Sequence, residues 1–135
     1  LSTVQTPAGP VGVNSNGQRA RSRGVEVTAT ARPIAGLVVQ VNAAYTDAKL
    51  LDDTVPAAGG ANLTGGLAGD TLPYTPKFQG GISADYDWNL SGGATAFVGG
   101  NLRFLGDQTG GFNAAYRTAF DRRVEIDGYA VLDLR

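Results

Sequence analysis

Two long segments of alternating apolar and polar residues, joined by a short turn within residues 20–53, constrain this chain more than any other feature. Alternation with a period of two residues gives a β-strand one apolar face and one polar face. Val38 is the exception to the pattern on the second segment. Pro33 cannot donate a ladder hydrogen bond and Gly36 tolerates a positive φ, so residues 33–36 are predicted to form the turn.

The length of these two predicted strands is informative. Each is roughly twice as long as the usual strand of about 5 to 6 residues. A β-strand that crosses a membrane needs about 9 to 11 residues, a length that a small water-soluble sandwich rarely requires. The length therefore favours membrane-spanning strands.

Composition limits the classes of function. The chain has 135 residues, which predicts one domain, and a formal net charge of −1, which argues against nucleic acid as a partner. It contains neither cysteine nor histidine, so zinc sites of the usual kind, disulfides and triads of the Ser-His-Asp type are excluded. We find no catalytic constellation and no cofactor motif, and predict that the chain is not an enzyme. No apolar run is long enough for a transmembrane helix.

Three further strands are predicted from the same alternation, at residues 76–89, 94–105 and 126–135. The first two are separated by a short turn at residues 90–93, which contains two glycines. Residues 1–6 could be the tail of another strand.

Long segments without periodicity separate the predicted strands. Residues 7–18, 51–73 and 106–124 are rich in turn-forming or small residues and are predicted to be loops. Long loops count against a compact soluble domain but are ordinary on the extracellular side of an outer-membrane barrel. The chain begins at Leu1 rather than Met and ends at Arg135 inside a predicted strand, so we expect it to be a piece of a longer protein.

This order of elements predicts an all-β, antiparallel up-and-down meander, a segment of a transmembrane β-barrel. Short periplasmic turns would lie at one end and long extracellular loops at the other. Aromatic residues near strand ends match the girdles of such barrels: Tyr45, Tyr74, Tyr86 and Trp88. The predicted polar faces carry charges that suit a wet lumen better than lipid: Glu26, Arg32, Asp85, Asp87, Arg103, Asp127, Asp133 and Arg135.

Residues 21–50, 72–78 and 129–135 resemble the C-terminal part of TonB-dependent outer-membrane receptors. In that family a Gly-Val-Glu strand precedes an Arg-Pro turn, an Ala-Tyr-Thr-Asp strand end leads into an outer loop, and a Pro-x-x-Pro-Lys segment returns to the next strand. The matching positions here are Gly24–Glu26, Arg32-Pro33, Ala44–Asp47 and Pro73–Lys77. Their order and spacing point to the family but not to a substrate.

The resemblance implies an outer-membrane location in a Gram-negative bacterium and a barrel of about 22 strands with a plugged lumen. Residues 1–135 would supply five to six of those strands, as a partial barrel domain, while the plug domain and the TonB box lie elsewhere. The implied partners are outer-membrane lipid, the remainder of the barrel with its plug, the TonB complex, and a small-molecule substrate. The implied function is active uptake of siderophore–iron, cobalamin or a similar nutrient.

The loop at residues 106–124 supplies the candidate ligand-facing residues. Phe112, Tyr116 and Phe120 could stack on a ligand or pack the loop onto its neighbours. A second set could meet an anionic siderophore or lipopolysaccharide phosphates: Arg117, Arg122 and Arg123. The alternative favoured for these arginines is a solvated loop with local ion pairs to Asp121 and Glu125. Asp47, Asp52 and Asp53 could bind Ca²⁺, but solvated acids at a strand end are the favoured interpretation.

Two other classes of function stay open at this stage. A passive porin-like barrel would close by itself with an even number of strands. A soluble β-sandwich or lipocalin-like binding module would turn its apolar faces into one core and have short loops. The cut appearance of the chain favours the transporter.

Overall fold

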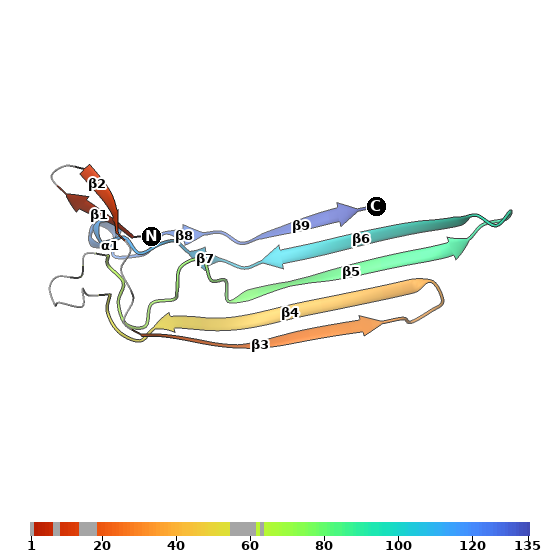
Figure 1. Cartoon of the computed structure of the whole chain (residues 1–135), viewed down its shortest axis with the longest axis horizontal. Coiled ribbons are helices and arrows are strands. Elements are labelled where there is room, and N and C mark those ends of the chain that lie inside the picture. The colour runs from red at the N-terminus through yellow and green to blue at the C-terminus, as the bar shows by residue number, and fades with distance from the viewer. Residues whose placement is uncertain (1, 7–8, 14–18, 55–61, 63) are drawn as a thin grey trace.

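One five-stranded antiparallel sheet, in the order β3-β4-β5-β6-β9, dominates the computed structural model (Figure 1). The structure describes residues 2–6, 9–13, 19–54, 62 and 64–135. The strands of the sheet are β3 (Ala20–Ala31), β4 (Leu37–Leu50), β5 (Phe78–Asn89), β6 (Thr95–Leu105) and β9 (Tyr129–Leu134). Each strand pairs with the next one along the sheet, so the predicted antiparallel meander is confirmed.

Smaller elements gather at one end of the sheet (Figure 1). β1 (Ser2–Thr6) pairs with β2 (Gly9–Val13), and β7 (Gln108–Thr109) pairs with β8 (Glu125–Ile126). α1 (Ala114–Phe120) lies between β7 and β8 in the sequence. Among the described residues, no helix is long and apolar enough to cross a membrane.

Two of the three predictions about the loops were wrong in part. Residues 9–13 form β2 instead of a loop; its Pro10 is compatible with a strand because both strands of a two-stranded ribbon are edges. The predicted loop at 106–124 contains β7 and α1. The predicted loop at 51–73 lies partly outside the described residues.

The last predicted strand, residues 126–135, is interrupted at Asp127 and Gly128. A Cβ at Gly128 would lie 2.5 Å from the carbonyl oxygen of Leu105, so the backbone there passes against the end of β6. The Gly128 N–H donates to the carboxylate of Asp107 (2.8 Å) instead of to a strand. Asp127 therefore lies outside the sheet. The alternation had predicted that it lies on the polar face of a strand, and this prediction was wrong.

The register of the sheet separates apolar from polar residues. One row of aliphatic residues runs across all five strands: Ala29, Val41, Ile82, Leu102 and Leu132. The adjacent row, on the opposite face, is polar: Thr30, Gln40, Ser83, Asn101 and Asp133. Val38 and Phe97 are exceptions on the polar face, opposite Asp85 and Asp87.

The apolar face is uncovered. Val25 is 67% exposed and Leu134 is 77% exposed, and of the described residues only Ala48 and Leu50 are buried hydrophobic residues. The accessible surface is 9219 Å² for a mass of 13.9 kDa. A compact monomer of that mass exposes about 6,700 Å². The sheet is thus a single layer, which argues against the soluble β-sandwich.

Aromatic side chains border this apolar face at two levels. Near the loop end, Tyr45 contacts Phe78, with ring centroids 5.0 Å apart. Near the short turns, Tyr86 stacks on Trp88 at 5.4 Å. Phe78 and Trp88 are ten positions apart on β5, roughly 34 Å along the strand, which corresponds to about 25 Å of height in a tilted barrel strand. Tyr74 is not part of either level, because it lies in the loop before β5 with a φ of 56°.

Both short turns lie at the end opposite the loops (Figure 1). Gly36 has a φ of 81°, and a Cβ there would lie 2.1 Å from the carbonyl oxygen of Asp87. The N–H of Asp87 donates to the carbonyl of Gly36 (3.0 Å), so the first turn is attached to β5. Glycine is therefore required at position 36 for two reasons: the backbone has a positive φ, and there is no room for a Cβ atom.

The assignment of faces can be tested with one charge placed on either side of β4. We expect Val41→Arg, at the centre of the apolar face, to lower the free energy of unfolding by about 2–4 kcal/mol, because a cation at the membrane midplane is poorly solvated. Asn42→Arg, its neighbour on the polar face, is the matched control and should cost well under half as much. Urea unfolding of the receptor in lipid vesicles measures both, and equal costs would contradict the assignment.

Candidate functional site

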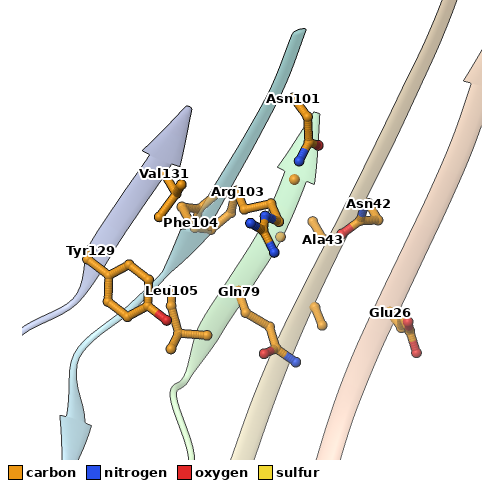
Figure 2. A pocket seen from close by; sticks show the side chains of 13 residues that line it. Glu26, Asn42, Ala43, Gln79, Asn101, Arg103, Phe104, Leu105, Tyr129 and Val131 are labelled. Carbon is orange, nitrogen blue, oxygen red and sulfur yellow. The ribbon is translucent and has the colours of Figure 1, made fainter. Parts of the chain in front are cut away.

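The polar face of the sheet carries a hollow of about 430 Å³ (Figure 2). Gly81 lies opposite both Asn42 and Arg103, so no side chain fills the space between them. The polar groups around it are a carboxylate, three amides and a guanidinium: Glu26, Asn42, Gln79, Asn101 and Arg103. These groups can donate and accept hydrogen bonds, so the hollow suits a hydrated or polar partner rather than lipid.

Two ion pairs cross strands on the same face. Arg135 donates to Asp85 at 2.6 Å across Gly99, where a Cβ would lie 2.1 Å from the Asp85 carboxylate. Arg103 lies 3.5 Å from Asp133. The predicted polar-face positions of these four residues and of Glu26 and Asp87 are confirmed, whereas Arg32 lies in the turn outside the strands.

At the loop end, the segment after β4 folds back on that strand. The N–H of Leu50 donates to the backbone carbonyl of Asp70, and the N–H of Leu72 donates to the backbone carbonyl of Ala48. Below this return the side chains of Ala48 and Leu50 are buried. Thr54 is also buried, and its hydroxyl bonds with Thr64, Asn62 and Gly66. The described part of this loop is held by polar contacts instead of a hydrophobic core.

The two long loops are joined by arginines. Arg117 on α1 donates to Asp70 at 2.5 Å, and both side chains are partly buried. Arg123 donates to the carbonyl oxygens of Thr71 and Gly110 and lies over the ring of Phe112, 4.6 Å from its centroid. Burial lowers the pKa of the Arg123 guanidinium, and the nearby charge of Asp70 opposes this effect. Both arginines serve as connectors between loops that are distant in sequence.

Helix α1 begins and ends with standard caps. The side chain of Asn113 accepts from the N–H of Tyr116 (3.0 Å) at the start of the helix. Asp121 ends it with a φ of 52°, and Arg117 in the last turn complements the helix dipole. Asn113 followed by Ala114 and Ala115 is the sequence signal for this helix, and a search for strand alternation does not detect it.

The chain matches the family model "TonB dependent receptor-like, beta-barrel" over residues 1–135. This chain belongs to the TonB-dependent receptor β-barrel family. No curated protein and no solved structure matches it significantly. Membership confirms the predicted resemblance, places the chain in the bacterial outer membrane, and makes it part of a transporter rather than of an enzyme.

In this receptor barrel the six candidate ligand-facing residues fall into two groups. Phe112, Arg117 and Arg123 are partly buried in the contacts between loops. Tyr116 packs against Phe120 with tilted rings whose centroids are 4.6 Å apart, and Phe120 is 59% exposed. Arg122 is exposed. The favoured alternative of local ion pairs to Asp121 and Glu125 was wrong for the described residues, because the ion pair formed here is the distant one between Arg117 and Asp70.

The three acids considered for Ca²⁺ each have other partners. Asp47 lies near Lys49 and Arg21, and Asp53 accepts from the N–H of Ala68. Asp52 accepts two hydrogen bonds from Arg19 (2.7 and 2.9 Å), which hold the pKa of that carboxyl below its usual value. No cluster of acids that could hold a metal occurs in the part of the chain that the structure describes.

The Arg117–Asp70 contact should hold the two loops of the receptor together. We expect Asp70→Asn to raise the population of opened loops roughly tenfold, since a partly buried hydrogen bond to a charged group contributes about 1.5 kcal/mol. The measurement is the rate at which an added protease cuts these loops on intact cells. Arg117→Gln should have the same effect, the double variant should add little to it, and exposed Arg122→Gln is the control. Independent effects of the two single variants would contradict the pairing.

Proposed function

We propose that residues 1–135 form five to six strands of a larger receptor barrel whose plug domain lies elsewhere, with the polar face towards the lumen. The single layer with one apolar and one polar face supports this arrangement. The outer strands β3 and β9 do not pair with each other in the described sheet, so they are available to neighbouring barrel strands. The same open edges give no support to a small porin that closes by itself.

We propose that the loop end is extracellular and the short turns are periplasmic. Outer-membrane barrels have short periplasmic turns and long extracellular loops, and the described turns and loops segregate in this way. The polar hollow would then face the plug domain, and its amides, its carboxylate and Arg103 would hydrogen-bond to that domain or to trapped water.

We further propose that the receptor takes up an iron–siderophore complex, cobalamin or a similar nutrient, and that the exposed end of α1 contacts it. Phe120 offers an exposed ring that packs against Tyr116, and Arg122 two residues later is also exposed. An aromatic face beside a cation suits a flat or anionic chelate. Phe112, Arg117 and Arg123 would position this surface instead of touching the substrate, because their side chains are engaged between the loops.

Binding measurements on the full receptor test this proposal. We expect the double variant Phe120→Ala/Arg122→Gln to bind its substrate at least tenfold more weakly, because it loses both a stacking surface and a charge-assisted hydrogen bond. Ferric siderophores and cobalamin, tested separately, identify the substrate class. Exposed Thr118→Ala on the same helix is the control and should bind normally. Unchanged affinity of the double variant for every ligand that the wild type binds would contradict the contact role of this surface.

A further inference from the structure

Three arginines alternate along one face at the start of β3. Arg21 and Arg23 precede Val25 at intervals of two residues, so they share its face, and Arg19 continues the row just before the strand. On β4 the same face continues beyond Tyr45 with Asp47 and Lys49, which lie opposite Arg23 and Arg21. This charged patch (residues 19, 21, 23, 47 and 49) lies next to the aromatic level at the loop end of the sheet, which is formed by Tyr45 and Phe78.

The patch points away from the lumen. The intervening residues Ala48 and Leu50 have their side chains on the opposite face, where they are buried under the returning loop. Tyr45 and Phe78 mark the height at which aromatic rings meet the membrane interface. The patch therefore lies at the height of lipid headgroups, on the outside of the barrel wall.

Positive charge in the patch exceeds negative charge. The patch holds four cations, Arg19, Arg21, Arg23 and Lys49, and one carboxylate, that of Asp47. Asp52 beside the patch pairs with Arg19, and the net charge is still +2 when Asp52 is counted. Asp52 is engaged by Arg19, and Asp47 lies 3.2 Å from Lys49 and 3.9 Å from Arg21.

The cations nearest the apolar face have unused donors. Within the described residues, Arg23 makes no ion pair and no side-chain hydrogen bond, and the only charged partner of Arg21 is Asp47, 3.9 Å from its Nη2 atom. These donors point to a ligand that is both anionic and rich in acceptor oxygens.

A hollow of about 370 Å³ lies at the border between the charged patch and the apolar face. Arg23 and Asp47 line its charged side, while Val25 and Tyr45 line its apolar side. A molecule that fits this border carries an anionic group on the side of Arg23 and an acyl chain on the side of Val25 and Tyr45. A free anion would leave the exposed Val25 and Tyr45 side chains uncovered.

We propose that the charged patch binds the phosphate of a phosphorylated glycolipid in the outer leaflet, with its acyl chains lying over Val25 and Tyr45. Arg23 and Arg21 present planar donor forks that pair with phosphate oxygens, and Lys49 adds a point charge. The carboxylate of Asp47 is compensated by Lys49 and Arg21, which limits its repulsion of the phosphate. This inference rests on the orientation proposed above, in which the loop end is extracellular.

The test uses the full receptor, purified in detergent and depleted of lipid, with lipopolysaccharide as the probe. We expect Arg21→Gln/Arg23→Gln to bind it at least tenfold more weakly than the wild type, and Arg23→Lys to lose part of that affinity. Arg32→Gln removes one arginine at the opposite end of the same hairpin and should bind normally. Enzymatically dephosphorylated lipopolysaccharide should bind the wild type as weakly as the intact lipid binds the double variant.

Two results would overturn the proposal. One is equal affinity of the wild type and the double variant for lipopolysaccharide. The other is displacement of the lipid by inorganic phosphate at similar concentration, which would make the patch a site for free anions. If the double variant fails to insert, as judged by its heat-dependent electrophoretic mobility, Arg23→Gln alone should show a several-fold loss. Substrate binding by the same variants should be unchanged, so failure of the substrate proposal is recognised separately.

Discussion

The completion of backbone hydrogen bonds in the absence of water is the constraint on which the structure depends. Lipid offers no partner for a free N–H or C=O, so a strand that meets lipid must pair on both sides. β4, β5 and β6 do so within the described sheet, and only β3 and β9 have an open edge. Once the backbone hydrogen bonds are formed, the sheet needs only one face that suits lipid and one that suits water. Alternating apolar and polar side chains provide these two faces.

The buried part of the chain is consequently found at the loop end rather than in the sheet. The described residues have their buried side chains in Ala48, Leu50, Thr54 and Thr64, which all lie where the loop returns over β4. Hydrogen bonds and the ion pair between Arg117 and Asp70 replace a hydrophobic core there. A surface loop held in this way can present exposed side chains such as Phe120 in a defined place.

The strands were predictable because their cause is local. Alternation between neighbouring residues predicted the five strands of the main sheet, their faces and the exception at Val38. The break at Asp127 and Gly128 was not predictable, because it depends on the close approach of Gly128 to Leu105 in another strand. β2 was missed because its Gly and Pro content is typical of a loop, and α1 was missed although Asn113 is a usual capping residue.

The candidate site was predictable only as a set of residue types. Arg117 and Arg123 were identified as charges that could meet an anion, but Arg117 pairs with Asp70 across 47 positions, and Arg123 bonds to the carbonyl of Thr71 across 52. Such contacts follow from the return of the loops over the sheet and have no local pattern. The spacing of Arg19, Arg21 and Arg23 is visible in the sequence. Their position next to the aromatic level of Tyr45 and Phe78 follows only from the pairing register of β3 with β4.

Adjacent residues of one strand should face lipid and water in turn, and this alternation can be measured directly. Single spin-labelled cysteines are placed one at a time from Val38 to Ala44 on β4 of a full receptor that has no other cysteine, in lipid vesicles; residues 1–135 themselves contain none. Accessibility is then measured to oxygen, which enriches in lipid, and to a water-soluble nickel complex. We expect odd-numbered positions to respond to oxygen and even-numbered positions to nickel, with a period of two. A uniform response along the strand, or the opposite phase, would contradict the assignment of the two faces.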